Sequence, residues 1–223
     1  MTGSIDLGSG PYRPTQLASF GSVHGTIDSP RQPPVDSATV VGRKCAGRPL
    51  PAAALAKGPT PVIVWIANAP AGKPYPVEKR GDLASDDCVL DPPVQAAIVG
   101  TTFNVFNDDK EIHRFVFIPH GTKDTLTVMP FFNAGQVVAS ERLAKAPGVV
   151  DVRCVRHPWM HSYIAVFNHP YFAVTDEKGA FAIDSLPPGN YTMMVWREGM
   201  PAPKSQAVQV AANGTATVHL SVQ

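Results

Sequence analysis

Charged residues are scarce in this chain, and neither sign of charge dominates. Of its 223 residues, 17% are charged, and the formal net charge at pH 7 is +1. Nucleic acids and anionic membrane surfaces attract basic patches, so this balance gives no reason to expect either as a partner. The sequence also lacks an apolar run long enough for a transmembrane segment.

Signals for helices are missing as well. Proline occurs 23 times, and proline breaks helix interiors. Strand signals are frequent, because short runs rich in β-branched and aromatic residues alternate with Gly, Pro, Asn and Asp. Examples are TPVIVWIAN (60–68), GTTFNVFN (100–107) and HRFVFIP (113–119). The first of these is expected to be buried on both faces. The sequence therefore predicts an all-β fold of sandwiches or Greek-key barrels.

Cysteine is rare too, with three in the chain: Cys45, Cys88 and Cys154. An odd number permits one disulfide and leaves one thiol that needs an explanation. Cys154 lies in the segment RCVRHPWMHSY (153–163), which also contains histidine and methionine. All three residue types bind soft or borderline metal ions, although they are ordinary core residues as well.

The spacing around Cys154 favours a metal site. Cys154 lies on the strand face that carries the core valines, so its thiol points inward. Met160 can return to the same point after the turn, and His113 begins a strand about forty residues upstream. Two imidazoles from His113 and His157, the thiolate of Cys154 and the weak thioether of Met160 make the ligand set of a blue-copper centre.

Other interpretations of these residues remain open. Cys154 and Met160 on their own would more often be core residues than ligands. Zinc could use the same cysteine and histidines, but a thioether is a poor zinc ligand. His161, next to Met160, is an alternative fourth ligand. The joint occurrence of His113, the Cys-x-x-His-x-x-Met spacing and an all-β context favours copper.

Several segments resemble the transthyretin-like, carboxypeptidase-regulatory type of β-sandwich. They are FGSVHGTI (20–27), TPVIVWIAN (60–68), VTDEKGAFAIDSLPPGNYTMMVWREG (174–199) and QAVQVAANGTATVHLSV (206–222). In the third, Asp176–Gly179 predicts a hairpin turn and Pro187–Gly189 a tight reversal. The resemblance implies a discontinuous sandwich formed by residues 19–72 plus 169–223. Residues 1–18 are expected to be an extended, loosely held N-terminal arm, and residues 73–168 an inserted second β domain.

The insert resembles the cupredoxins, and its ligand loop is similar in length to that of amicyanin. The resemblance rests on the spacing of Cys154, His157 and Met160 and on the upstream N-x-D…H pattern that ends at His113. It implies a cupredoxin Greek-key β-sandwich with one type 1 copper site held by these four residues. The combination of the two sandwiches looks like the methylamine-utilisation and plastocyanin-like proteins of bacteria. Cupredoxins usually carry Asn after the first histidine ligand, where it holds the ligand loop, whereas Arg114 stands here.

The predicted function is that of a bacterial, exported blue copper protein that carries single electrons between redox proteins. Expected partners are a c-type cytochrome or a dehydrogenase. We expect no enzyme activity, because no nucleophile–base pair with recognisable spacing is present. Copper binding for handling or delivery remains an alternative, as does an accessory β module with a vestigial metal site. The start MTGSIDLGSG has no signal-peptide features, so a periplasmic or extracellular location supposes a processed form.

Two further expectations concern the surroundings of the site. A disulfide between Cys45 and Cys88 would tie the insert to the outer sandwich and would fit an oxidising compartment. The alternative is two buried thiols in a cytosolic protein. Pro158 and Trp159 are expected to frame an exposed edge of His157 where a redox partner docks, although Trp159 could equally fill the core.

Overall fold

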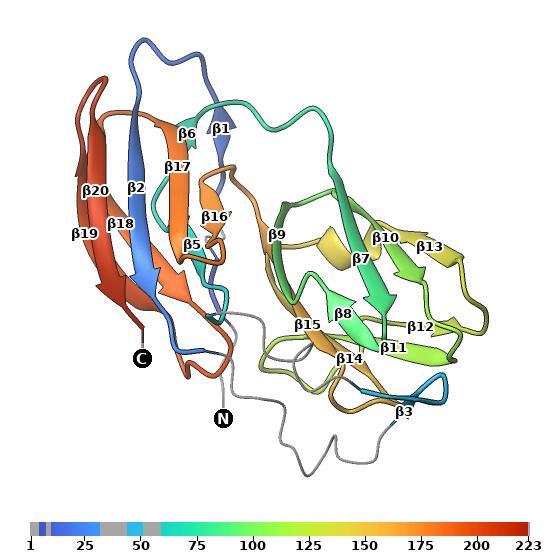
Figure 1. Ribbon diagram of the computed structural model, residues 1–223. Coiled ribbons are helices and arrows are strands. Elements are labelled where there is room, and N and C mark those ends of the chain that lie inside the picture. The colour runs from blue at the N-terminus through green and yellow to red at the C-terminus, as the bar shows by residue number, and fades with distance from the viewer. Residues whose placement is uncertain (1–4, 8–9, 32–43, 51–58, 223) are drawn as a thin grey trace.

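The computed structural model describes residues 5–7, 10–31, 44–50 and 59–222. Within these ranges the chain consists of β-strands joined by turns, and the helical structure is limited to the 3-10 helix Arg142–Ala144. No helix in this part of the chain is long and apolar enough to cross a membrane. The all-β fold class predicted from the sequence is confirmed, and Figure 1 shows two β-sandwiches side by side.

The sandwich that contains the candidate ligands is made of a four-stranded and a five-stranded sheet. The first has the order β13-β10-β7-β8, formed by Gln136–Ser140, Thr102–Asn107, Arg80–Asp86 and Val89–Asp91. The second has the order β12-β11-β14-β15-β9, formed by Thr127–Phe131, His113–Pro119, Gly148–Cys154, His161–Phe167 and Val94–Ile98.

Alternating side chains build the core between these two sheets. Strand β10 buries Phe103 and Val105, and β11 buries Phe115 and Phe117, while the residues between them face outward. This is the two-residue period expected of strands with one buried face. Cys154 lies in the same apolar cluster, so the candidate ligand residues sit at the edge of a packed core.

The other sandwich combines strands from both ends of the chain. Its four-stranded sheet has the order β16-β5-β18-β19, formed by Phe172–Val174, Ile63–Ile66, Gly189–Trp196 and Lys204–Val210. Its three-stranded sheet has the order β17-β2-β20, formed by Ala180–Leu186, Gly21–Asp28 and Thr215–Ser221. Residues Val62–Ile66 are buried on both faces, as the sequence predicted.

The turn at Asp176–Gly179 is present, but the prediction that it closes a hairpin is wrong. Gly179 N donates to Asp176 O at 2.9 Å, and the Asp176 carboxylate accepts the amides of Lys178 and Ala180. The flanking strands β16 and β17 belong to different sheets. A local turn signal fixes the reversal of the chain but not the partner of each strand, which depends on long-range pairing.

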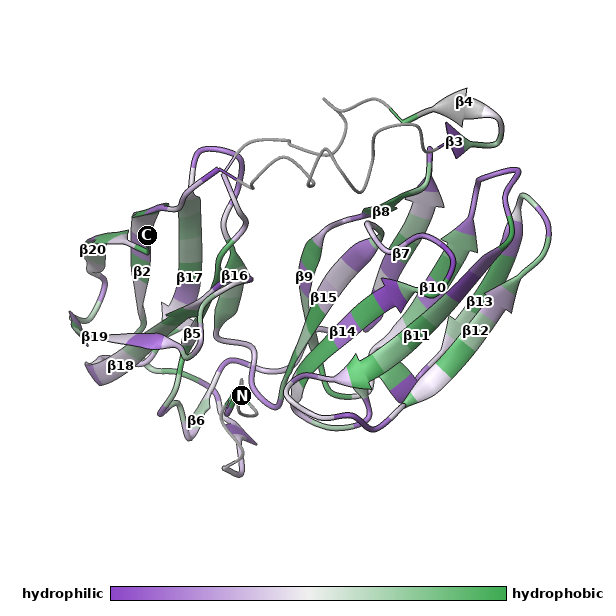
Figure 2. Cartoon of the chain, turned by 90° about the horizontal axis from the view of Figure 1, so that it is seen from below, coloured by the Kyte–Doolittle hydropathy of each residue, from purple (hydrophilic) through white to green (hydrophobic). Residues whose placement is uncertain are grey.

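The two sandwiches pack against each other through apolar side chains. The outer face of β9 and β15 turns toward β5 and β16, as Figure 2 shows. The Phe167 ring lies 4.5 Å from that of Phe172, nearly parallel to it, and 6.0 Å from that of Trp65. Val94 and Tyr163 of the insert share one apolar cluster with the outer sandwich. The interface is therefore part of a continuous core.

The N-terminal arm is extended but not loosely held where it is described. Ile5 and Leu7 are 7% and 2% exposed and belong to the core cluster of the outer sandwich. Strand β1 (Arg13–Pro14) pairs in parallel with β6 (Ala71–Gly72). The expectation of a loose arm is wrong for these residues, because the few apolar side chains of the arm pack into the core of the outer sandwich.

Residues 44–50 belong to the insert by packing, although they precede it in sequence. They form the short hairpin β3–β4 (Lys44–Cys45 and Arg48–Pro49). Cys45 and Leu50 lie in the apolar cluster of the candidate ligand domain. Cys45 forms a disulfide with Cys88, with 5.7 Å between the Cα atoms. The bridge thus fastens this hairpin onto the end of the insert.

His169, at the junction between the sandwiches, is a buried group whose protonation the fold opposes. It is 2% exposed, its Nδ1 accepts the Tyr171 amide at 3.2 Å, and its Nε2 has no hydrogen-bond partner. Burial lowers the pKa of His169 to about 4. At pH values between the ordinary pKa of 6.5 and this lowered pKa, the unfolded state therefore binds a proton that the folded state does not bind,.

We expect the free energy of unfolding to fall as the pH decreases through that interval. His169 should account for about 3 kcal/mol of the loss between roughly pH 7 and pH 4. The variant His169→Asn keeps an acceptor for the Tyr171 amide and should flatten this part of the profile. Urea unfolding of both proteins across the interval measures the difference, and identical slopes would contradict the assignment to His169.

Candidate metal centre

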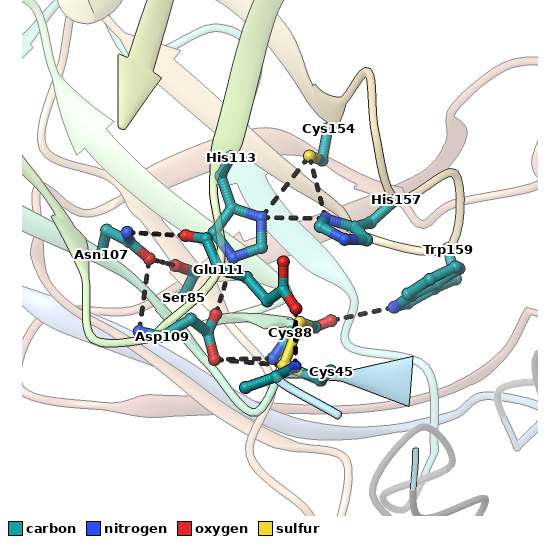
Figure 3. Close-up of a disulfide and its surroundings, with 11 residues drawn as sticks. Cys45, Ser85, Cys88, Asn107, Asp109, Glu111, His113, Cys154, His157 and Trp159 are labelled. Carbon is teal, nitrogen blue, oxygen red and sulfur yellow. Dashed lines mark hydrogen bonds and ion pairs between the residues drawn. A yellow bond between two sulfur atoms is a disulfide. The ribbon is translucent and has the colours of Figure 1, made fainter. Parts of the chain in front are cut away.

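Three side chains from distant parts of the sequence meet at one end of the five-stranded sheet. His113 begins β11 and Cys154 ends β14, which pairs antiparallel with β11. Cys154 Sγ lies 3.6 Å from His113 Nδ1 and 3.5 Å from His157 Nδ1. The two Nδ1 atoms are 3.0 Å apart. Figure 3 shows the three atoms as the corners of a closed triangle.

This triangle fits a metal ion. Distances of about 2.0 Å to nitrogen and about 2.3 Å to sulfur place the ligands of one ion roughly 3–4 Å apart, which is the range observed. His113, Cys154 and His157 are 0%, 4% and 7% exposed, so water competes little for the position. The donor set of two imidazoles and one thiolate suits copper or zinc.

Backbone hydrogen bonds hold the loop that carries the ligands. Met160 N donates to His157 O at 2.9 Å, and Cys154 N donates to Met160 O at 3.1 Å. Val155 N donates to Arg114 O at 3.0 Å. The side chain of Arg114 is exposed, so the main chain of this residue holds the loop to β11, whatever side chain follows the first histidine.

The carboxylate of Asp109 orients the first histidine. Asp109 Oδ2 lies 2.9 Å from His113 Nε2, and both side chains are buried. With its Nε2–H donated to the carboxylate, His113 presents Nδ1 toward Cys154, and once Nδ1 loses its proton its lone pair would be available to a metal ion. The ring of His113 also stacks on Phe115, with centroids 5.4 Å apart. The imidazole is therefore fixed in rotation and in tautomer.

Asn107 in turn holds the turn that carries Asp109. Its side-chain oxygen accepts the amide of Asp109 and the hydroxyl of Ser85. Its side-chain amide donates to the backbone oxygens of Glu111 and Asn133. Asp109 and Asn107 were not predicted as functional residues, although both lie in the N-x-D…H pattern that the sequence displays.

The electrostatics of the cluster favour a thiolate. Burial raises the pKa of Cys154, but hydrogen bonds from His113 and His157 outweigh it and lower this pKa to about 5. Burial lowers the pKa of His113, whereas the Asp109 carboxylate and the Cys154 thiolate raise it to about 9. For Asp109 burial acts to raise the pKa, and the hydrogen bond from His113 holds it below its usual value.

Met160 and His161 point to different surroundings. Met160 is 1% exposed and lies in the apolar cluster that contains Cys154 and Trp159. His161 Nε2 instead pairs with the Glu198 carboxylate of the outer sandwich, 3.1 Å from Oε1, and this contact raises its pKa. Of the two candidates for a fourth ligand, Met160 is therefore the one that faces the core beside the site.

Trp159 does not lie where the docking prediction placed it. It is 6% exposed, its indole Nε1 donates to Cys88 O at 3.0 Å, and its ring lies 5.1 Å from that of His157. Pro158 is exposed. Trp159 is thus a core residue, and the docking expectation for it is wrong because the indole turns inward to Cys88 O and packs in the apolar cluster that also contains Cys45 and Leu50.

The disulfide lies directly beside the imidazoles. One nitrogen of His113, one nitrogen of His157 and Cys88 Sγ lie within 4.8 Å of one another. A sulfur held in a disulfide has no thiolate to offer a metal ion, so the free cysteine Cys154 is the one that could supply a sulfur ligand.

The comparisons with known proteins find one family model and several solved structures. Residues 161–223 match the family model of the carboxypeptidase regulatory-like domain. A search of curated proteins finds no match. Among solved structures, a reduced amicyanin mutant is similar at 17% identity and a TM-score of 0.35, covering 41% of this chain and 86% of that one.

Two further solved structures are similar at comparable identity and TM-score. A purple cupredoxin from Nitrosopumilus maritimus has 20% identity and a TM-score of 0.33, covering 39% of this chain and 98% of its own. A copper-containing nitrite reductase from Thermus scotoductus has 22% identity and a TM-score of 0.35, covering 46% of this chain and 25% of its own.

In metal-free protein the thiolate of Cys154 should form at low pH. We expect the ultraviolet absorbance of the thiolate to titrate near pH 5, far below the ordinary thiol value of 9.0. Cys45 and Cys88 do not contribute, because they are bridged. Asp109→Asn should move the titration upward, since it removes the charge that keeps His113 protonated. Cys154→Ser is the control, and a titration near pH 9 in the unaltered protein would refute the assignment.

Proposed function

We propose that the protein is a type 1 copper protein that carries single electrons between redox partners. The observation that supports this most strongly is the buried triangle of His113 Nδ1, His157 Nδ1 and Cys154 Sγ. Met160 is buried in the apolar cluster that contains Cys154. A trigonal set of two imidazoles and one thiolate with a weak axial thioether is characteristic of such centres. Copper bound there would supply a one-electron couple.

The residues of the pocket are suited to rapid electron transfer because they are already in place. His113 is fixed by Asp109 and Phe115, and Cys154 by the pairing of β14 with β11. Ligands that do not move when the charge of the site changes reduce the reorganisation that accompanies transfer. Burial also excludes water, which would otherwise reorganise around the changing charge.

A carrier is favoured over the alternatives that the sequence left open. All four proposed ligands are at most 7% exposed, so neither a substrate nor a metal-accepting protein meets an exposed ligand. We therefore propose that the protein is not an enzyme and does not deliver copper. The alternative of an accessory β module with a vestigial metal site is supported by the match to the carboxypeptidase regulatory-like domain at residues 161–223. It does not account for the Asp109–His113 contact inside the other sandwich.

The disulfide supports an exported protein, because such bridges persist in oxidising compartments. We propose a periplasmic or extracellular location, and a c-type cytochrome or a dehydrogenase as redox partner. Docking would use the exposed rim of the ligand loop, which includes Pro158 and Val155, the latter 60% exposed. Arg114 and Arg156 are exposed beside them, so the partner should present acidic groups.

The copper(II) form should be intensely coloured through charge transfer from the Cys154 thiolate. Cys154→Ser should abolish the visible band, and His157→Ala should shift or abolish it. His24→Ala is the matched control, because His24 is exposed and bonded to Asp184 in the outer sandwich. Visible absorption and spin resonance of the copper-loaded proteins measure the result. A copper-loaded protein without this band, or a band that survives Cys154→Ser, would overturn the proposal.

Reversing a charge on the rim should slow electron transfer without changing the colour. Arg114→Glu should lower the second-order rate of reduction by the partner several-fold at low ionic strength, and the difference should shrink as salt screens it. Arg80→Glu is the control, since Arg80 is exposed at the opposite end of β7 from the site. Stopped-flow reduction measures both, and equal rates for the two variants would exclude docking at this rim.

A further inference from the structure

All three cysteines of the chain gather around the same two imidazoles. Cys154 lies on the Nδ1 side of His113 and His157. The Cys45–Cys88 bridge lies nearby, with Cys88 Sγ within 4.8 Å of a nitrogen of each ring. Figure 3 shows the bridge beside the rings, with Asp109 and Trp159 on either side of Cys88.

The backbone of Cys88 reaches both imidazoles through one intermediary each. Its N–H donates to Asp109 Oδ1 at 3.0 Å, and the other carboxylate oxygen of Asp109 bonds His113 Nε2 at 2.9 Å. Its C=O accepts the Trp159 indole N–H at 3.0 Å, and the Trp159 ring packs against His157. Moving this one peptide segment would disturb the supports of both rings.

The conformation of Cys88 is one that its side chain does not favour. Asp87 and Cys88 form the two-residue loop between β7 and β8, with φ of 49° and 55°. A two-residue hairpin loop with both φ positive is the type I′ pattern, in which glycine is preferred at the second position. The turn tip of the facing hairpin, Ala46 and Gly47, is also left-handed. The disulfide therefore joins two turns that contain left-handed residues, and it holds Cys88 where glycine would be expected.

We propose that Cys88, kept in this conformation by its bridge to Cys45, is the positioning residue for both imidazoles of the metal pocket. The identity of the metal rests on the proposed function, but the positioning does not. The Cys88 side chain keeps the turn in place, and the turn presents one donor and one acceptor in the directions that Asp109 and Trp159 require. Glycine at position 88 should be able to keep the same turn without the bridge.

Two double variants that both lack the bridge separate positioning from cross-linking. Cys45→Ser/Cys88→Ser has serine at position 88, which disfavours the left-handed conformation. Cys45→Ser/Cys88→Gly has glycine there, which accepts this conformation. Both lose the cross-link, so the part of the thermal stability that the cross-link supplies is lost in both. In the serine variant, loss of a support for the ligands should speed copper release to a chelator by about 10- to 100-fold. The glycine variant should stay close to the unaltered protein.

A second readout uses metal-free protein and does not depend on copper. The His113 Nε2–H and the Trp159 indole N–H should be protected from solvent exchange by NMR in the unaltered protein and in the glycine variant, and lose protection in the serine variant. If the serine and glycine variants behave alike in both measurements, the turn does not position the rings. If copper does not bind but the exchange pattern is as expected, the proposed function fails and the positioning stands.

A third variant covers the case in which the serine variant does not fold. Trp159→Phe keeps the bridge and the ring but removes the hydrogen bond to Cys88 O. It should speed copper release while the His113 Nε2–H remains protected, because only the His157 side loses its support. If Trp159→Phe releases copper at the unaltered rate, Cys88 does not position His157. If His113 Nε2–H loses its protection in this variant as well, the two imidazoles are not supported separately, and the proposed role of Cys88 is wrong.

Discussion

The hydrogen bond between the Asp109 carboxylate and His113 Nε2 is the interaction on which the rest of the candidate site depends. Without it the imidazole could present either nitrogen to Cys154, and no charge would compensate a buried thiolate. With it, Nδ1 faces the sulfur at 3.6 Å and the carboxylate, imidazole and thiolate form one chain of alternating charge. A low local dielectric strengthens such a chain but makes each unpaired member costly, so the surrounding residues must hold it complete.

Both sandwiches help to hold the candidate ligand residues in place. The insert supplies the strand ends and the turn that carries Asp109. The outer sandwich supplies Glu198, which bonds His161 and accepts the Tyr163 hydroxyl at 3.0 Å. Because His161 follows Met160 directly, the far end of the ligand loop is tied to the outer sandwich, while Val155 ties its near end to β11. The shared apolar core between the sandwiches thus gives the ligand loop two rigid supports.

The hairpin fastened by Cys45 changes what this end of the insert can present to a partner. Cys45 and Leu50 share an apolar cluster with Trp159, and the Trp159 indole bonds the backbone of Cys88. The exposed surface left near the ligands comes from Arg114, Val155, Arg156 and Pro158. A partner would therefore meet a mixed apolar and basic rim, while Trp159 would support the site from the core and not touch the partner.

The sequence by itself determined the β-rich architecture and the local chemistry. Alternating apolar residues specify strands, and the short spacing of Cys154, His157 and Met160 keeps three possible metal donors in one loop. These signals are local, so they can be read from short stretches. The sequence also indicated the Cys45–Cys88 pairing, which the structure contains.

Only the tertiary structure decided that His113 meets Cys154, which of Met160 and His161 turns inward, and whether Trp159 is exposed. Each of these depends on a contact with a residue distant in sequence: β11 with β14, His161 with Glu198, and Trp159 with Cys88. The same holds for the strands beside the Asp176 turn, which enter different sheets. A local pattern sets the direction of a side chain along its own strand, but the partner it meets is set by the global packing of the sheets.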